Sequence, residues 1–294
     1  MKKEFPNLKV QQKIDDIAII GIDIKFPEAD NLDMFWKNLT ESKESIREIP
    51  SERKKDLYNY RNFSGLSTQE KDIPKLGYLE SIDKFDYNFF NISPKEASLM
   101  DPNQRLFLEV AWKTIEDAGY GGECLKSRNV GVYLGYKSAC SNIYQNMIEK
   151  IDPQLMEVGA IGNKPTVIAS RLSYLLDLKG PNMLVDTACS SALVCIHLAC
   201  QAIRNLECEM ALVGSIKLDI LPQVSQVKMG IESPDGRVRA FDDEANGTGG
   251  GEGVAAILLK PLSKAMEDKD HIYAVIKGSA VNQDGHSMGI AAPN

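Results

Sequence analysis

The stretch Val185–Ile203, VDTACSSALVCIHLACQAI, places a single cysteine, Cys189, between a short apolar run and a long apolar segment. The run Asn182–Ala188 predicts a buried strand, and the residues from Cys189 to about Glu207 predict a helix. On a helical wheel, the polar residues of this segment gather in one narrow sector, so we expect the helix to be buried over most of its circumference. Such a helix belongs in the middle of a layered fold.

Further strands are predicted on both sides of this stretch by runs of Val, Ile, Leu and Ala with little polar alternation, a pattern typical of strands covered on both faces. They are Asp15–Ile22, Asn129–Tyr136, Glu209–Ile216, Gly253–Lys260 and His271–Ala280. Because helical patterns fall between these runs, the sequence predicts an α/β fold with a largely parallel or mixed sheet.

Two helix starts have clear signals. Asp101 can cap a helix in which Pro102 takes the first position, Gln104 completes a capping box and Gly119 ends the helix. Upstream, the segment SPKE at 93–96 has the same pattern of a capping serine followed by a glutamate. The charged stretch 51–75 lacks periodicity and is predicted to be a surface loop.

Composition limits the class of protein. The 294 residues are 43% hydrophobic and 26% charged, which is typical of a globular chain. The formal net charge of −7 and the lack of a basic stripe argue against nucleic-acid binding. No apolar run is long enough to span a bilayer, and the first residues have no secretory h-region, so we expect no membrane contact and a cytoplasmic location.

The chain contains six cysteines, Cys124, Cys140, Cys189, Cys195, Cys200 and Cys208. A reduced cytosolic environment argues against disulfides, and the spacings do not match a zinc module, so no metal is expected. All except Cys189 are interpreted as small core residues. At the start of a helix, backbone N–H groups and the helix dipole would stabilise a Cys189 thiolate, which makes this residue the candidate nucleophile. A buried thiol at a turn remains the alternative.

None of the three histidines is a convincing base for this thiol. His197 lies eight residues after Cys189, about 12 Å further along a helix axis and roughly 80° round it. We therefore interpret it as part of the polar stripe, hydrogen-bonded locally. His271 and His286 are expected to be solvated surface residues. The chain is predicted to hold a nucleophile without a histidine partner.

The segment VDTACSSALV resembles the active-site signature of the β-ketoacyl synthase (ketosynthase) domain of modular type I polyketide synthases, in the thiolase-like superfamily. Residues 17–39, 100–120, 168–181, 233–265 and 274–294 resemble further blocks of that domain in the same order. The resemblance implies a thiolase-like layered αβαβα fold, of which this chain has the first half and the start of the second. It also implies that Cys189 accepts an acyl chain from the phosphopantetheine of an acyl carrier protein.

In that family, two later histidines in EAHGTGT-like and NxGH-like motifs drive decarboxylation and carbon–carbon bond formation, and neither motif occurs here. The segment Asn246–Gly253, NGTGGGEG, lacks the histidine and fits an earlier glycine-rich loop. We interpret it as a tight turn before the strand Gly253–Lys260, and not as a phosphate loop, because no GK[ST] follows. The expected organisation is an N-terminal linker over residues 1–14 and a C-terminally truncated ketosynthase domain over 15–294.

Two functions remain open. The first is a ketosynthase, an acyltransferase that takes an acyl chain on Cys189 and performs decarboxylative Claisen condensation with a carrier-bound extender unit. The alternative is a non-condensing docking, dimerisation or gating half-domain. The expected partner is an acyl carrier protein that brings its own phosphopantetheine, since we expect no cofactor bound by the chain itself. The complete domain is expected to be a homodimer, with the strand Asn182–Ala188 near its two-fold axis.

Overall fold

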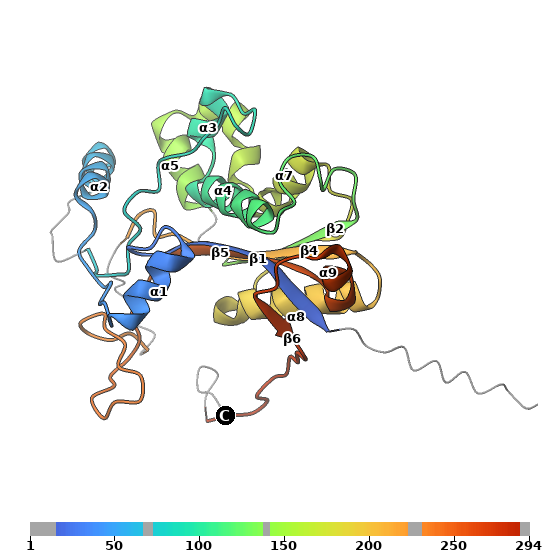
Figure 1. Ribbon diagram of the computed structural model, residues 1–294. Helices are drawn as coiled ribbons and strands as arrows, with labels where there is room; N and C mark the ends of the chain where they lie inside the picture. The colour runs from blue at the N-terminus through green and yellow to red at the C-terminus, as the bar shows by residue number, and fades with distance from the viewer. Residues whose placement is uncertain (1–15, 67–72, 138–141, 223–230, 289–294) are drawn as a thin grey trace, which may run out of the picture.

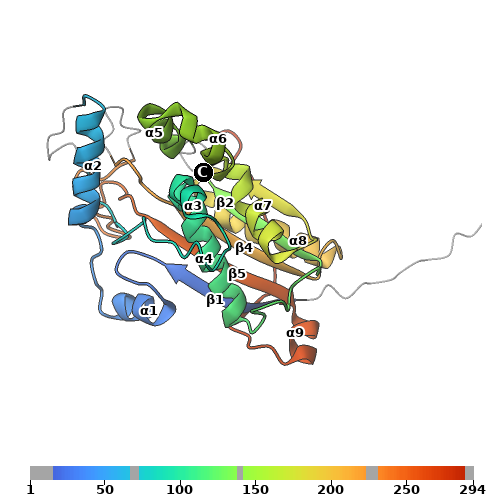
Figure 2. The same ribbon diagram turned by 90° about the horizontal axis from the view of Figure 1, so that it is seen from above.

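A computed structural model describes residues 16–66, 73–137, 142–222 and 231–288 as a mixed α/β sheet with helices on both faces (Figures 1 and 2). The six strands are β1 (Ile17–Lys25), β2 (Val130–Tyr136), β3 (Asn182–Val185), β4 (Met210–Lys217), β5 (Gly253–Pro261) and β6 (Ala274–Ile276). Their order across the sheet is β3-β2-β4-β5-β1-β6. Strands β3, β2 and β4 are parallel, whereas β5 and β1 are antiparallel neighbours and β6 runs antiparallel to β1. The predicted α/β class and mixed sheet are confirmed.

Helices surround this sheet unevenly. They are α1 (Leu32–Thr40), α2 (Ser51–Phe63), α3 (Pro94–Leu99), α4 (Pro102–Asp117), α5 (Ile143–Ile151), α6 (Met156–Gly159), α7 (Pro165–Leu176), α8 (Ser191–Arg204) and α9 (Leu262–Asp268). Figure 1 shows α3, α4, α5 and α7 above the sheet and α8 below it. Among the described helices, none has the length and apolar character needed to cross a membrane.

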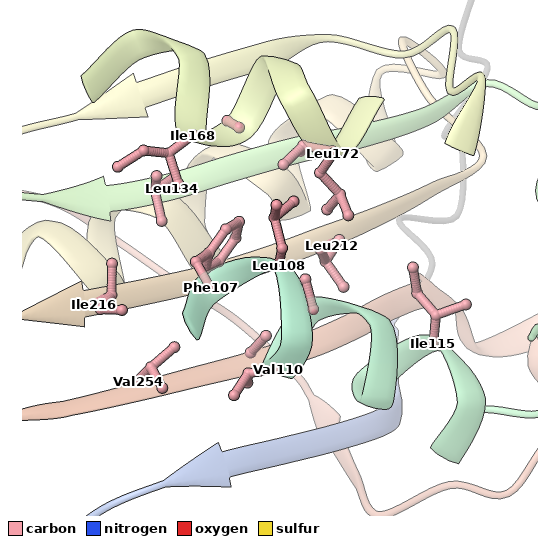
Figure 3. Close-up of a cluster of buried hydrophobic side chains, with 14 of the residues drawn as sticks. Phe107, Leu108, Val110, Ile115, Leu134, Ile168, Leu172, Leu212, Ile216 and Val254 are labelled. Carbon is pink, nitrogen blue, oxygen red and sulfur yellow. The ribbon is translucent and has the colours of Figure 1, made fainter. Parts of the chain in front are cut away.

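The main hydrophobic core lies between the sheet and the helices α4 and α7 (Figure 3). Phe107 and Leu108 of α4 are fully buried there, together with Leu134 of β2 and Leu212 of β4. A second core on the opposite face joins the sheet to α8. Alternate residues of each central strand therefore enter different cores, which is why these strands appear continuously apolar in the sequence.

Helix α8 is buried against the sheet and partly exposed on its other side. Its residues Cys195, Ala199, Cys200 and Ile203 are buried against the sheet, but Leu193 is 72% exposed. The prediction that this helix is buried over most of its circumference is confirmed in part: most of its residues are buried or half-buried, but Leu193, expected on the apolar side, is exposed.

The predicted start of α4 is confirmed in part. Asp101 caps the helix, and its Oδ1 accepts hydrogen bonds from the backbone N (2.7 Å) and Nδ2 (2.8 Å) of Asn103. The helix ends before Gly119, which takes a left-handed φ of 78°. The capping box does not form, because the buried Gln104 amide has no hydrogen-bond partner among the described residues.

In the upstream helix α3, the serine also caps the helix and the residue three positions later again does not complete a capping box. Ser93 caps it by accepting a 3.1 Å hydrogen bond from the backbone N of Glu96, as the sequence predicts. The Glu96 carboxylate instead pairs with Arg171 of α7, with 2.7 Å between Oε1 and Nη1. Glu96 thus fastens α3 to α7, and the cap depends on the serine.

The prediction of a surface loop over 51–75 is wrong for its first half, since Ser51–Phe63 forms α2. The buried side of this helix consists of Arg53, Leu57 and Arg61, spaced four residues apart. Because two of the three buried residues are arginines, the segment has no apolar periodicity, and the sequence therefore did not indicate a helix. Residues 67–72 and the predicted linker 1–14 lie outside the described residues.

The glycine-rich segment Asn246–Gly253 leads directly into β5, as predicted, but it is a packed loop and not a tight turn. A Cβ on Gly249 would lie 1.9 Å from the carbonyl oxygen of Gly236, so only glycine fits there. Glu252 near its end is buried and receives four hydrogen bonds, from both terminal nitrogens of Arg53 and from the backbone N of Leu79 and Asp219.

Two predicted strands are shorter than expected. β3 stops at Val185, because residues Ala188–Ser190 form a 3-10 turn before α8. β6 covers only Ala274–Ile276 of the predicted segment 271–280, and it pairs with the first three residues of β1. Both short strands lie at the edges of the sheet.

Candidate active site

Cys189 lies in the 3-10 turn between β3 and α8, and its side chain is exposed. The parallel strands β2, β3 and β4 end at the same edge of the sheet, so the turn stands at their carboxyl ends. Ligand and catalytic sites of open α/β sheets are found at this edge. The predicted position of Cys189 on a strand-to-helix turn is confirmed.

The backbone beside the thiol is strained. Ala188, immediately before Cys189, has a left-handed φ of 53°. For a residue with a Cβ, this conformation costs about 1–2 kcal/mol. The Asp186 carboxylate helps to hold it, since its Oδ1 accepts a 3.1 Å hydrogen bond from the backbone N of Ala188. Strain of this kind persists only where the surrounding structure determines the conformation.

The two serines after the cysteine fasten the turn. Ser191 Oγ donates to the carbonyl oxygen of Ala188 (2.8 Å) and accepts from the backbone N of Thr187 (2.8 Å). Ser190 Oγ donates to the carbonyl oxygen of Thr187, also at 2.8 Å. Neither serine bonds the Cys189 sulfur. The N-cap residue Ser190 makes no side-chain cap to α8. The backbone N–H groups of Ser190 and Ser191 donate within the turn, to the carbonyl oxygens of Thr187 and Ala188. The positive end of the helix dipole lies next to Cys189.

The first turn of α8 lies directly against β2. A Cβ on Gly135 would lie 2.9 Å from the backbone N of Ala192 and 3.0 Å from the carbonyl carbon of Ser191. Glycine is therefore needed for this approach. Ser215 of β4 donates a 2.8 Å hydrogen bond to the carbonyl oxygen of Gly135. The ends of two strands thus fix where α8 begins, a contact that the sequence did not reveal.

The other described cysteines differ from Cys189 in burial. Cys195, Cys200 and Cys208 are buried, as predicted for core residues. Burial raises the pKa of Cys195 and of Cys208 to about 11, and it also raises the pKa of Cys200. These thiols therefore stay neutral and unreactive near pH 7.

The core prediction is wrong for Cys124, which is exposed because it belongs to the polar turn region after α4. Cys140 lies outside the described residues. None of the described cysteines forms a disulfide, and no cluster of metal-ligating side chains occurs among the residues that the structure describes. Within the described chain, Cys189 is the exposed thiol that stands at a helix start.

The structure brings no histidine into a hydrogen bond with Cys189 within the described residues. Nδ1 of His197 lies 3.0 Å from Oγ of Ser279. This bond joins positions 82 residues apart, so the prediction of a local partner is wrong, although the position on the polar stripe is confirmed. His271 and His286 are exposed, as predicted, and His271 stacks edge-on against Tyr273 with 4.5 Å between the ring centroids.

A mixed sheet with helices on both faces, and a cysteine just before one of these helices, is the arrangement of the thiolase-like fold that ketosynthases have. The family described as beta-ketoacyl synthase, N-terminal domain, matches residues 15–265, so the chain belongs to this family. Among solved structures, the ketosynthase from module 6 of the bacillaene synthase of Bacillus subtilis 168 superposes with a TM-score of 0.81. It is 43% identical, and the match covers 95% of this chain and 46% of that one.

Other relatives give the same result. The oxazolomycin ketosynthase domain from Streptomyces albus JA3453 is 34% identical at a TM-score of 0.81, over 95% of this chain and 48% of that one. The polyketide synthase PksM of Bacillus subtilis (strain 168) is 45% identical over 299 residues, which is 100% of this chain and 7% of PksM. The chain thus spans about half of the solved ketosynthases and a small part of the curated synthases.

Proposed function

We propose that Cys189 is the acyl-accepting nucleophile of a polyketide synthase ketosynthase. The observation that carries this proposal is the contrast between thiols: Cys189 is exposed in the 3-10 turn just before α8, whereas Cys195, Cys200 and Cys208 are buried and held neutral. A helix start favours the thiolate, which is the reactive form of cysteine. The family of the chain supports acyl transfer as the chemistry.

In the proposed step, the Cys189 thiolate attacks the carbonyl carbon of an acyl-pantetheine thioester on an acyl carrier protein. A bond forms between Sγ and the carbonyl carbon, and the carbonyl oxygen becomes negatively charged. The bond from that carbon to the pantetheine sulfur then breaks. The sulfur leaves with the electron pair and takes up the proton that Cys189 released. The positive end of the α8 dipole lies beside this step and would favour the negative charge that develops.

Condensation makes a further demand. Loss of carbon dioxide from a carrier-bound extender unit leaves an enolate, which needs groups that bind the thioester carbonyl. His197 is hydrogen-bonded to Ser279. His271 and His286 are exposed, and neither forms a hydrogen bond with Cys189 in the described chain. We therefore propose that this chain by itself accepts an acyl group but forms no β-ketoacyl product. The relatives give no specific support to a purely non-condensing docking or gating half.

The exposed edge of strand β3 could pair with a second copy of this chain. This edge has no neighbouring strand in the described sheet, and an open edge is a template for pairing. Near it, Met183, Leu193 and Tyr174 are 42%, 72% and 85% exposed. A two-fold axis beside β3 would bring two such apolar surfaces together. We propose that the complete domain forms a homodimer through β3, and light scattering of the complete domain tests this.

Intact-mass spectrometry tests acyl loading. Incubation with an acyl-pantetheine thioester should add one acyl group to the chain, and Cys189→Ala should abolish the addition. Cys124→Ala is the matched control, because Cys124 is also exposed but does not stand at a helix start. Equal loss of the adduct in both variants would overturn the assignment. A β-ketoacyl product from malonyl carrier protein would refute the claim that the chain alone does not condense.

A further inference from the structure

His197 makes a long-range contact that acyl transfer at Cys189 does not use. It lies on the side of α8 that turns away from the buried residues Cys195 and Ala199, since two residues along a helix are 200° apart. Its Nδ1 is 3.0 Å from Oγ of Ser279, three residues after β6. Both side chains are half-buried. A histidine in the middle of the nucleophile's helix therefore holds the chain that leaves the last strand.

Two other contacts anchor the same short segment. Ile276, the last residue of β6, packs against the core between α8 and the sheet. Lys277 Nζ lies 2.6 Å from Oδ2 of Asp16, at the start of β1. Ser279 follows as the third anchor within four residues, and residues 280–286 beyond it are exposed. The bond to His197 is thus the last of these anchors before the exposed part of the chain.

The direction of β6 gives this bond its importance. β6 ends at Ile276, opposite Ile17, so it runs away from the sheet edge at which Cys189 stands. The chain must reverse to return to that edge. Figure 1 shows the dark red segment after β6 passing beneath α8 toward the side of the molecule that carries the loop 231–252. His197 contacts the segment at the beginning of this return.

We propose that His197 is a positioning residue, whose hydrogen bond to Ser279 clamps the returning chain onto the outer side of α8. The clamp directs residues 280–288, including His286, toward the end of α8 that carries Cys189. The consequence for catalysis rests on the proposed function, because an ordered segment there limits how a thioester approaches the thiol. His197 acts through this segment and does not take part in the reaction.

Three variants test the clamp. His197→Leu and Ser279→Ala each remove the bond, whereas in His197→Asn the amide occupies nearly the position of Nδ1 and can keep it. Hydrogen exchange of residues 274–279, which include the paired strand β6, should become about tenfold faster in the first two variants and stay near the parent rate in His197→Asn, as mass spectrometry can measure. The thioester concentration that gives half of the maximal acylation rate should rise at least threefold in the same two variants, with the maximal acylation rate constant unchanged.

The two measurements also separate the possible failures. Unchanged exchange in both His197→Leu and Ser279→Ala would overturn the clamp. A slower acylation in His197→Leu alone, with Ser279→Ala like the parent, would show that His197 acts by another route and would also overturn it. If the parent chain takes no acyl group on Cys189, the proposed function fails, and the exchange measurement still decides whether the clamp exists.

Discussion

Arg53 and Glu252 form a buried bidentate ion pair between α2 and the residue before β5, with distances of 2.6 and 2.7 Å between guanidinium nitrogens and carboxylate oxygens. The same guanidinium donates to the carbonyl oxygens of Leu79 and Asp219, at 2.9 and 3.2 Å. Four segments that are distant in the sequence therefore meet at one pair of side chains. The pair explains why a charged helix and a glycine-rich loop are fixed against the sheet.

Removal of one partner should destabilise the fold strongly. We expect Arg53→Met or Glu252→Gln to lower the free energy of unfolding by about 3–5 kcal/mol, because each leaves an unpaired polar group buried. The double variant should cost less than the sum of the two, by at least about 1 kcal/mol. Urea unfolding measures these values. Lys264→Ala, which breaks the exposed pair with Glu267, is the control and should change stability by less than about 0.5 kcal/mol. Additive effects would contradict the coupling.

Ala188 offers a test of backbone strain next to Cys189. Glycine adopts a left-handed φ without penalty, so Ala188→Gly should leave stability unchanged or raise it by up to about 1 kcal/mol. Ala188→Val should lower it by about 2 kcal/mol or more, because a β-branched residue resists this conformation. Thermal unfolding measures both effects. Labelling of Cys189 in the valine variant should slow down if the strained turn presents the thiol, and an unchanged labelling rate would contradict that role.

Thiol labelling distinguishes the cysteines directly. In the folded chain at pH 7, we expect iodoacetamide to modify Cys189 before Cys124, because Cys189 stands just before a helix and Cys124 does not. Cys195, Cys200 and Cys208 should react only after unfolding, since burial keeps these thiols neutral and covered. Peptide mapping after brief exposure measures the order. Earlier modification of Cys195 or Cys124 than of Cys189 would remove the basis for the nucleophile assignment.

The sequence predicted those parts of the molecule that depend on local pattern. The apolar runs located all the strands of the described sheet, and Asp101 and Ser93 located two helix starts. The sequence did not predict helix α2, because Arg53 can be buried only with its partner Glu252, which is 199 residues away. The sequence also did not predict the left-handed conformation of Ala188 or the contact of Gly135 with α8, since both depend on how distant segments meet.

We expect the buried carboxyl of Asp23 in β1 to make the free energy of unfolding depend on pH. Its Oδ2 is buried and has no hydrogen-bond partner among the described residues. Burial raises the pKa of this carboxyl to about 6, although the nearby Lys113 charge acts in the opposite direction. In the unfolded chain the pKa is about 3.9, so the unfolded state loses this proton first as the pH rises. Asp23 should therefore lower stability progressively between about pH 4 and pH 6, and by a constant amount above that range.

Replacement of Asp23 by asparagine removes the charge and tests this dependence. At pH 7.5 we expect Asp23→Asn to raise the free energy of unfolding by about 1–2 kcal/mol, a value reduced from the full shift because the group is only partly buried. At pH 4 the gain should vanish, because the parent carboxyl is then protonated in the fold. Asp30→Asn, at an exposed position, is the matched control and should have no effect at either pH. Urea unfolding at the two pH values measures the difference, and an equal gain at both would show that the ionised carboxyl of Asp23 is not its cause.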